Sequence, residues 1–535
     1  MSKISDLGDH SARTLRPVPD LPATNTERAL QLLRDGEWEE ALALIDRHWL
    51  EVWYHSSPPQ TGALLADVPK KMFRSHAGAA YLYRLTGPGD SWLESSDIPA
   101  ESVTRNVQDA EHRATRQAIL ASQLRLTGKT IAAMEVLADS RSSVDALEKP
   151  LIDTSAGLVP FLHLQAGITA LLAGSSVLAH AWLSRGESCE NDLRFGFTKR
   201  DAALKQALLH AFYGDPEDAG RCLDRAAEMP RTESWAEPWI DQTGMIAAAM
   251  ISPDRNVPVT DADAHALADT PLNSFGEMWP FALWARVALA LGAGDIDTAY
   301  REVASAEAST LLGTEGDGVA AGAIPVASTA LLMVHGRLAE ARAELDRAPQ
   351  HLLRVQLFRV RLEYLCGNLE QAVSLAVSID EQAAGFMRSR VELAGVLAAS
   401  YLAMGESDRA RDVLCSALRG RDSLPDSVLR TIPGELVDHA RAHWGSDPAL
   451  RAIIAESAVA PLYSVRNRAV ELSQREQEIL GQLASTHTLA AIADAMFISH
   501  NTLKTHVRRI YQKLDVTSRR DAVHQANLLG LIPAA

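Results

Sequence analysis

A short pattern of glycine and alanine recurs along most of this 535-residue chain and constrains its fold more than any other feature. A glycine follows an apolar helix end, and an alanine stands five residues later. The pattern occurs at Gly36/Ala41, Gly128/Ala133, Gly174/Ala179, Gly214/Ala219, Gly294/Ala299, Gly336/Ala341, Gly367/Ala372 and Gly405/Ala410. Glycine ends a helix because it accepts a left-handed backbone, and the small alanine lets the next helix pack closely on the first. The pattern therefore predicts helix pairs stacked around one continuous core, an α-solenoid.

The spacing of these glycines indicates the size and number of the repeats. Neighbouring glycines are 31 to 46 positions apart, except for two gaps of 92 and 80 positions. Each long gap is close to twice the others, so we expect a degenerate unit in each, one around Gly87 and one in residues 252–267. This gives about ten units of roughly forty residues. Because no strand pattern interrupts them, the predicted fold class is all-α.

The repeat pattern resembles the tetratricopeptide repeat, in which a bulky residue follows the alanine by four positions and a second small residue comes after it. Ala219, Leu223 and Ala226 show this order. The resemblance implies a tetratricopeptide-like array that serves for sensing or interaction. The expected domains are a flexible leader at 1–25, the array at 26–445, a helix and linker at 446–462, and a C-terminal domain at 463–535.

Charge is divided unevenly between the array and the C-terminal domain. The whole chain has a formal net charge of −16. Residues 463–535 contain nine Lys or Arg and six Asp or Glu, a net charge of +3, which leaves −19 for residues 1–462. An acidic array repels a polyanion, so only the C-terminal domain suits contact with nucleic acid.

The cysteines and the lengths of the apolar runs indicate the cellular compartment of the protein. The four cysteines are widely scattered without a Cys-x-x-Cys pair, which indicates a reducing compartment and neither disulfides nor a zinc site. The N-terminus lacks the apolar core of a signal peptide, and no apolar run reaches the ~18 residues of a membrane span. We therefore expect a cytoplasmic protein with no membrane partner, no metal and no cofactor.

Four helices are predicted in the C-terminal domain. They span residues 472–484, 488–496, about 501–514 and about 518–529. The first begins with a capping box, in which Ser473 is followed three residues later by Glu476. Thr488 and Ser499 stand where the second and third helices need an N-cap residue. These local signals predict a compact helical domain.

The third helix has two distinct faces. Apolar residues recur at helical spacing on one side, and polar or basic residues recur on the other. The apolar face comprises Leu503, Val507, Ile510 and Leu514, and the polar face comprises Asn501, Lys504, Thr505 and Arg508. We expect the first face in a core and the second presented outward, as in a helix that enters a groove of DNA.

This segment resembles the LuxR-type (GerE-like) helix-turn-helix domain, a four-helix DNA-binding module. The matching residues are Leu472, Arg475, Glu476, Ile479, Leu480, Ala484, Ile492, Ala493, Ile498, Ser499, Thr502, Lys504, His506, Ile510, Lys513, Leu514, Val516, Ser518, Arg519, Ala522 and Val523. The chain departs from the family at Thr486 and Asp515, where glycine is usual, and at Ala491, where glutamate is usual. The resemblance implies that the third helix enters the major groove of double-stranded DNA and that the fourth pairs two copies of the domain.

The resemblance also implies a set of contact residues. The expected DNA-binding residues are Ser499, Asn501, Thr502, Lys504, Thr505, Arg508, Arg509 and Lys513, and the expected dimer seam is Ala522, Ala526 and Leu529. Lys504 and Arg508 suit guanine edges or phosphates. Thr505 suits a thymine methyl or a phosphate, and Asn501 suits an adenine edge or the backbone. Which of these contacts is base-specific stays open at this point.

Together the two parts resemble large LuxR-type regulators of the MalT-like kind, in which a helical-repeat sensor precedes the DNA-binding domain. Those regulators usually begin with an ATPase module. Here Gly128-Lys129-Thr130 lacks the glycine that a phosphate loop needs at position 123, where Gln123 stands. We expect a bacterial DNA-binding transcriptional regulator, not an enzyme, that binds DNA as a homodimer. Its array would bind a small-molecule or protein effector, and RNA polymerase is a further candidate partner.

Two alternatives stay open. The chain could instead be a repeat-based interaction scaffold with a degenerate helix-turn-helix, since an extended acidic surface suits basic peptides. The tryptophans of the array are expected in its core by default. The alternative is that Trp235, Trp239, Trp279 and Trp284 form a ligand face that stacks on a sugar or a peptide.

Overall fold

The computed structural model describes residues 24–86, 110–139, 157–189, 195–255, 266–454, 459–463, 472–484, 488–514 and a few single positions up to Leu531. No strand occurs among these residues, and the predicted all-α fold class is confirmed. The chain divides into two compact units. Unit 1 comprises residues up to His112 together with Glu233–Ala236, and unit 2 comprises Arg113–Thr232 and Glu237–Ala535. The repeat expected around Gly87 lies outside the described residues.

Unit 1 contains the first helix pair. Its described elements are α1 (Asn25–Asp35), α2 (Trp38–His55), α3 (Pro58–Ala66), the 3₁₀ helix η1 (Lys70–Ser75) and α4 (Ala77–Thr86). A capping box starts α1, because the Thr24 hydroxyl accepts from the Glu27 amide and the Glu27 carboxylate accepts from the Thr24 amide. Gly36 ends α1 in a left-handed conformation, and α2 folds back against it.

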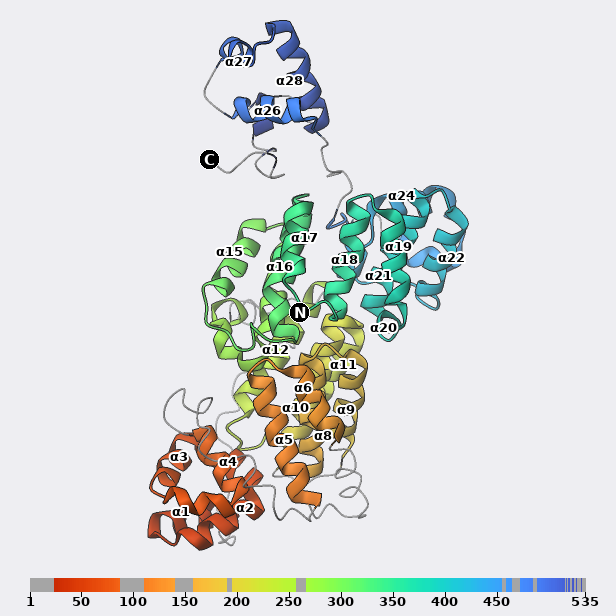
Figure 1. The fold of residues 1–535 in the computed structure, drawn as a ribbon. Coiled ribbons are helices and arrows are strands. Elements are labelled where there is room, and N and C mark those ends of the chain that lie inside the picture. The colour runs from red at the N-terminus through yellow and green to blue at the C-terminus, as the bar shows by residue number, and fades with distance from the viewer. Residues whose placement is uncertain are drawn as a thin grey trace, which may run out of the picture. The chain divides into compact units, whose positions relative to one another are not determined.

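Unit 2 holds the rest of the predicted array (Figure 1). Its described elements up to Ile454 are α5 (Ala110–Leu126), α6 (Thr130–Asp139), α8 (Leu158–Leu172), α9 (Ser176–Ser188), α10 (Gly196–Tyr213), α11 (Pro216–Glu228), α12 (Glu237–Arg255), η5 (Leu272–Met278), α14 (Trp279–Gly292), α15 (Ile296–Glu307), α16 (Val319–Val334), α17 (Leu338–Asp346), α18 (Leu353–Leu365), α19 (Leu369–Ser378), α20 (Asp380–Ala384), α21 (Met387–Ala403), α22 (Ser407–Leu418), α23 (Asp426–Leu429), α24 (Gly434–His443), η6 (Pro448–Leu450) and α25 (Arg451–Ile454). Consecutive helices pair, as in α8 with α9, α16 with α17 and α21 with α22. This succession of helix pairs agrees with the predicted solenoid.

The residues of the repeat pattern take the places that the pattern predicts. All eight alanines, at positions 41, 133, 179, 219, 299, 341, 372 and 410, are 0 % exposed. Seven of the eight glycines have a φ between 70° and 84°. Gly214 is the exception, with a φ of −107°. Closely packed helix pairs therefore depend on the small side chain at each alanine position.

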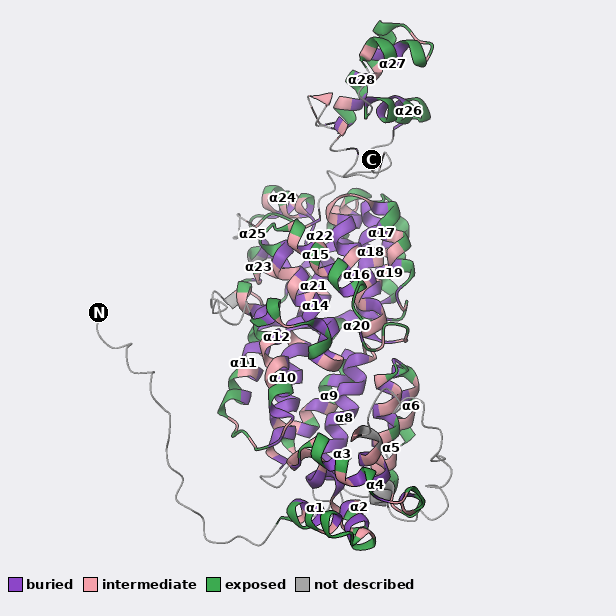
Figure 2. Cartoon of the chain, turned by 90° about the vertical axis from the view of Figure 1, so that its left-hand side faces the viewer, coloured by how far each residue is buried: buried purple, intermediate pink, exposed green. Residues whose placement is uncertain are grey.

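The first helices of the pairs are enclosed within unit 2. All 15 residues of α8 are buried, and most of those in α10 and α18 are buried as well. Figure 2 shows α8 in purple along its length. A helix without a solvent face forms an interior, so solvent meets mainly the second helices, such as the amphipathic α11. The helix α10 also contacts α21, although the two lie far apart in the sequence.

The turn at Gly128 does not form a phosphate loop. The backbone amide and hydroxyl of Thr130 both donate to one carboxylate oxygen of Asp317, each over 2.7 Å, and the Asp317 amide donates to the Gly128 carbonyl oxygen. Glycine is required where the two backbones meet, since a Cβ at Gly316 would lie only 2.2 Å from the Gly128 oxygen. A carboxylate thus occupies the start of α6, the position that a phosphate would need.

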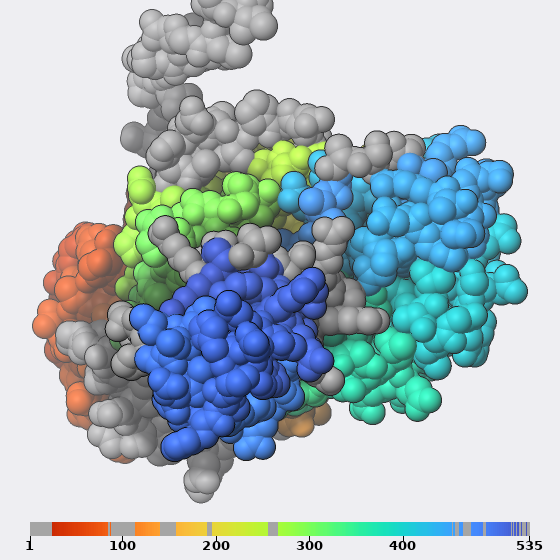
Figure 3. Space-filling view, turned by 90° about the horizontal axis from the view of Figure 1, so that it is seen from above, coloured from red at the N-terminus to blue at the C-terminus, as the bar shows by residue number. Residues whose placement is uncertain are grey.

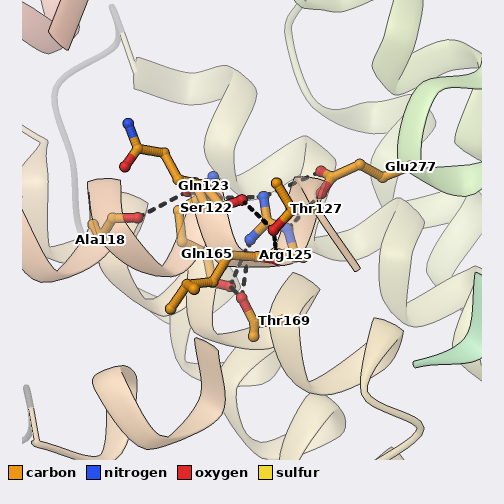
Figure 4. A network of polar contacts seen from close by, with 9 residues as sticks. Ala118, Ser122, Gln123, Arg125, Thr127, Gln165, Thr169 and Glu277 are labelled. Atoms are coloured by element: carbon orange, nitrogen blue, oxygen red, sulfur yellow. Dashed lines mark hydrogen bonds and ion pairs between the residues drawn. The ribbon is translucent and has the colours of Figure 1, made fainter. Parts of the chain in front are cut away.

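A second long-range contact lies one turn before this loop (Figure 4). The buried Arg125 guanidinium forms a bidentate ion pair with Glu277, with Nε to Oε1 at 2.6 Å and Nη2 to Oε2 at 3.1 Å. It also donates to Gln165 and, over 2.9 Å, to the Thr169 hydroxyl. Arg125 therefore joins α5, α8 and η5 within unit 2.

No helix among the described residues combines the length and the apolar character that crossing a lipid bilayer requires.

Candidate nucleic-acid interface

Three described helices form the C-terminal domain: α26 (Gln474–Leu483), α27 (Leu489–Ala495) and α28 (His500–Leu514). Their predicted capping residues are confirmed. Ser473 and Glu476 form a capping box, and the Thr488 hydroxyl accepts from the Ala491 amide. The Ser499 hydroxyl accepts from the Thr502 amide over 3.1 Å. Local side chains thus fix where each helix begins.

The apolar face of α28 lies in the core of this domain, as predicted. Leu503 and Ile510 are fully buried, and Val507 and Leu514 are nearly so. They pack with apolar residues of the other two helices, among them Ile479, Leu480, Leu483, Ile492 and Ala493. The orientation of α28 is therefore set by the residues that it buries.

The opposite face of α28 is exposed. Asn501, Thr502, Lys504, Thr505, Arg508 and Arg509 all face solvent in the domain. The sequence of α28 contains no Asp or Glu, so its charge is wholly positive. The space-filling view shows this domain, in dark blue, as a compact body (Figure 3). Exposed cationic side chains on one helical face can neutralise phosphates and donate to base edges.

The hydroxyls of three predicted contact residues make hydrogen bonds at the start of α28. The Thr505 hydroxyl donates to the Asn501 carbonyl oxygen over 3.0 Å, and the Ser499 and Thr502 hydroxyls lie 2.8 Å apart. These bonds hold the first turns of α28 in a fixed conformation.

Lys513, a further predicted contact residue, is engaged inside the domain. Its Nζ donates to Glu476 Oε2 over 2.7 Å, and Glu476 is only 5 % exposed. The hydrogen bond from Lys513, followed by that from the Ser473 amide, holds the pKa of Glu476 below its ordinary value. Lys513 therefore joins the end of α28 to the start of α26.

The turn between α27 and α28 has a feature that sequence reasoning missed. Phe497 has a φ of 53°, and it is the sole described non-glycine residue with a positive φ. Its side chain is 96 % exposed. Arg475 donates to the Met496 carbonyl oxygen over 2.7 Å and so supports the turn from α26. The sequence shows only that Phe497 stands two positions before the capping Ser499, and this order does not predict a left-handed backbone.

Two of the three residues predicted to contact a second copy, Ala522 and Ala526, are buried inside the domain. Ala522 and Ala526 are 0 % exposed and belong to the apolar core with α26 and α28. The Ala522 amide donates to the Ser518 carbonyl oxygen, as in a helix. Leu529 lies outside the described residues. Because their methyl groups are enclosed by the domain itself, Ala522 and Ala526 present no surface to a second copy in this conformation.

Of the residues at which the chain departs from the family pattern, Ala491 is described. It is exposed on α27, and its amide donates to Thr488. Its replacement of a glutamate therefore leaves the cap of α27 intact. Thr486 and Asp515 lie outside the described residues.

The four tryptophans proposed as a ligand face have different surroundings. Trp235 belongs to unit 1, where its ring stacks on Tyr54 at 5.7 Å and meets Trp53 edge-on at 5.1 Å. Its Nε1 donates to the Trp53 carbonyl oxygen over 2.6 Å. The other three tryptophans belong to unit 2.

Within unit 2 the three tryptophans do not share one environment. Trp279 is 1 % exposed, and its Nε1 donates to the Leu312 carbonyl oxygen. Trp284 is half-buried and meets the ring of Phe212. Trp239 is 50 % exposed and packs against Gly276. The structure thus shows one tryptophan in the core, one at its edge and one at the surface. Ligand binding by these tryptophans stays a prediction.

Comparison with known proteins connects this geometry to a family. Residues 470–526 match the model of the bacterial regulatory proteins of the luxR family. The probable transcriptional regulatory protein NarL of Mycobacterium tuberculosis strain H37Rv is 35 % identical over 108 residues, which are 19 % of this chain and 46 % of that protein. The uncharacterized transcriptional regulatory protein YxjL of Bacillus subtilis is 33 % identical over 108 residues, 19 % of this chain and 50 % of that protein.

A third relative is the HTH-type transcriptional regulator MalT of Yersinia enterocolitica. It is 44 % identical over 62 residues, 12 % of this chain and 7 % of that protein. The matched region thus spans half or less of each relative's own length. The match at residues 470–526 includes the three described helices and their exposed cationic face. This chain carries at its C-terminus a helix-turn-helix domain of the luxR family of bacterial regulatory proteins.

Proposed function

We propose that this protein is a bacterial transcription regulator that binds double-stranded DNA in a sequence-specific way by placing α28 in the major groove. The observation that supports this most strongly is the division of α28 into a buried apolar face and an exposed face without acidic residues, on a domain of a regulatory family. A helix of this diameter fits the major groove, where each base pair offers a distinct set of donors and acceptors.

In this proposal Lys504 and Arg508 provide the main contacts. Both are exposed, and each can donate to guanine edges or phosphates. Because the Thr505 hydroxyl donates to its own helix, its methyl group is the part that would contact a thymine methyl. Asn501, one turn earlier, would donate to and accept from an adenine edge. Arg509, which is also exposed, would contact the adjacent phosphate backbone.

The array supplies the control in this proposal. Residues 1–462 carry a net charge of −19, so they do not compete for DNA, and their repeats suit a sensor of a small-molecule or protein effector. We expect two copies to bind half-sites about one helical turn apart, through contacts other than Ala522 and Ala526. Such a regulator would act in the bacterial cytoplasm and contact RNA polymerase there.

The first test removes two charges from α28 in the full chain. A DNA site is first obtained by selection from random sequences, and binding is then followed by gel shift. Lys504→Ala with Arg508→Ala should weaken binding to this site by about 30-fold or more, since each contact to a base edge contributes about 1–3 kcal/mol. The matched control is Arg221→Ala with Arg347→Ala, two array residues that are each 63 % exposed. The control should bind like the unaltered protein.

The salt dependence of binding separates this function from its alternative. The logarithm of affinity should fall steeply with the logarithm of salt concentration, by about 0.9 per phosphate neutralised. The alanine variant should have a shallower slope. Binding that is unchanged in the double variant, or selection that yields no site, would favour the interaction scaffold instead.

A further inference from the structure

A five-residue segment ahead of the DNA-binding domain is docked on helices of the array within unit 2. We call this segment, Val459–Tyr463, the anchor segment. Tyr463 is 5 % exposed and belongs to the same apolar core as the helices of the array. The Leu462 amide donates to the Arg430 carbonyl oxygen over 2.7 Å, and Pro461 lies against Gly434. The chain is thus fixed nine positions before Leu472, which is the first described core residue of the C-terminal domain.

Tyr463 is held by a buried charged group. Its ring covers the Arg361 guanidinium, whose Cζ lies 4.7 Å from the ring centroid, and meets the Phe358 ring edge-on. Arg361 is 1 % exposed, and its Nη2 donates to Glu392 Oε1 over 3.3 Å. A buried guanidinium is stabilised by an aromatic ring packed against it, because the face of the ring carries a partial negative charge.

The carboxylate beneath Tyr463 is shared between two guanidinium groups. Arg354 donates to Glu392 Oε2 over 3.0 Å, and it also donates to the Phe212 carbonyl oxygen of α10. Two positive charges therefore share one negative charge in a largely buried setting. The ring of Tyr463 offsets part of the excess positive charge, so its docking is coupled to contacts that join α10, α18 and α21.

The anchor segment itself is held by few contacts. Among the described contacts, one backbone hydrogen bond and the nearly buried Tyr463 ring attach it, and Val459 and Leu462 pack against the core while still partly exposed. Ala460 and Pro461 are exposed. The helices beneath it, in contrast, are buried along most of their length. A segment attached in this way opens without unfolding the structure that it covers.

Docking of the anchor segment limits the reach of the DNA-binding domain. An extended chain spans at most about 3.3–3.6 Å per residue, so the nine positions from Tyr463 to Leu472 reach roughly 30 Å. The last described helical residue before the segment is Ile454 in α25, and the eighteen positions from Ile454 to Leu472 reach at most roughly 60 Å when extended. Half-sites one helical turn apart have centres about 34 Å from each other. Release therefore roughly doubles the distance over which the domain can extend from the array, which matters most for half-sites that are further apart than one turn.

We propose that the anchor segment can detach from the array, and that in its docked state it limits how far the DNA-binding domain can extend from the array. The buried ring of Tyr463 is the contact that keeps the segment docked. This regulation rests on the proposed DNA-binding function. It places the control point at Arg361, Glu392 and Arg354, where rearrangement of the array would release the ring.

Hydrogen exchange in the full chain tests the release. The Leu462 amide should exchange at least tenfold faster than the amides of α21 in the unaltered protein. Tyr463→Ala should speed exchange at Leu462 by a further tenfold or more and leave α21 unchanged, whereas Tyr463→Phe should match the unaltered protein. Exchange of Leu462 at the rate of α21 in the unaltered protein would overturn the proposal, because the segment would then open only with the array.

A disulfide can lock the anchor segment. A Cβ built at Gly434 lies 3.8 Å from the Cβ of Pro461, within the usual range of about 3.5–4.5 Å for a disulfide. Gly434→Cys with Pro461→Cys is made in a Cys366→Ser background, since Cys366 is exposed. The oxidised protein is locked, and the same protein after reduction is the matched control.

DNA binding by the oxidised, locked protein tests whether docking of the anchor segment limits the reach of the DNA-binding domain. Pairs of selected half-sites are separated by increasing numbers of helical turns. The oxidised protein should bind the widely separated pairs at least tenfold more weakly than the reduced protein, with equal binding at the shortest separation. Equal binding at every separation would overturn the proposal. If no form binds the selected DNA, the proposed function fails, while hydrogen exchange still decides whether the anchor segment opens.

Discussion

Lys513 near the end of α28 donates a hydrogen bond to the nearly buried carboxylate of Glu476 in the first turn of α26, over 2.7 Å. This pair joins the helix that faces solvent with cationic residues to the helix that begins the domain. A lysine that the family resemblance predicts to contact DNA thus has a structural partner in the domain itself.

Lys513→Met should therefore affect stability more than electrostatic binding. Because Lys513 is 41 % exposed, loss of the pair should cost about 0.5–1 kcal/mol. Hydrogen exchange of α26 in the full chain measures this loss. The salt slope of DNA binding should stay unchanged, whereas Lys504→Ala should lower it by about one. A lowered slope in Lys513→Met would show that Lys513 leaves Glu476 to contact a phosphate.

The same pair predicts a dependence of domain stability on pH. The hydrogen bond from Lys513 lowers the pKa of Glu476 from its unfolded value of 4.5. Stability from this carboxylate is therefore complete above that value, and it is lost as the pH falls through the lower pKa of the folded state. Hydrogen exchange of α26 should report this loss between about pH 5 and pH 3. Glu476→Gln should show a weaker loss over that range, and equal losses would contradict the assignment.

Phe497 offers a stabilising substitution. The left-handed conformation costs a non-glycine residue about 1–2 kcal/mol, and glycine avoids this cost. Glycine also makes the unfolded state more flexible, which offsets part of the gain in stability. The phenyl group is 96 % exposed and contributes little burial. Phe497→Gly should therefore stabilise the domain by about 0.5–1 kcal/mol, measured by denaturant unfolding. Phe497→Val serves as the opposite control and should destabilise it.

Replacing an alanine of the repeat pattern by a larger residue should destabilise the array. Ala341 in α17 is 0 % exposed, so Ala341→Leu should force the helix pair apart and cost about 2 kcal/mol or more. Ala339 is exposed on the same helix, and Ala339→Leu is the matched control. Urea unfolding of the two variants measures the difference. Equal midpoints would show that the alanine position does not govern the packing.

Features set by neighbouring residues could be predicted from the sequence. The capping box of Ser473 and Glu476, the cap at Thr488 and the buried alanines depend on residues within one or two helical turns. A local pattern is enough for these, because the physical interaction and the pattern occupy the same few positions.

Features that join distant segments could not be predicted. The chain gives no sign that Arg125 pairs with Glu277, that Tyr463 docks over Arg361, or that the array divides into two units. The exposed faces of α28 followed from periodicity, but the engagement of Lys513 depends on how α26 and α28 cross. Such contacts are fixed by tertiary packing rather than by local preference.

The carboxylate of Asp317 that caps α6 has a consequence for biosynthesis. Asp317 stands 187 positions after Thr130, and its carboxylate accepts a hydrogen bond from the Thr130 amide. When the ribosome has delivered α6, the acceptor for its first turn has still to be translated, along with every helix from α8 to α15. The nascent chain therefore completes this early repeat only late in translation, and messages truncated before residue 317 should yield a frayed, protease-sensitive α6.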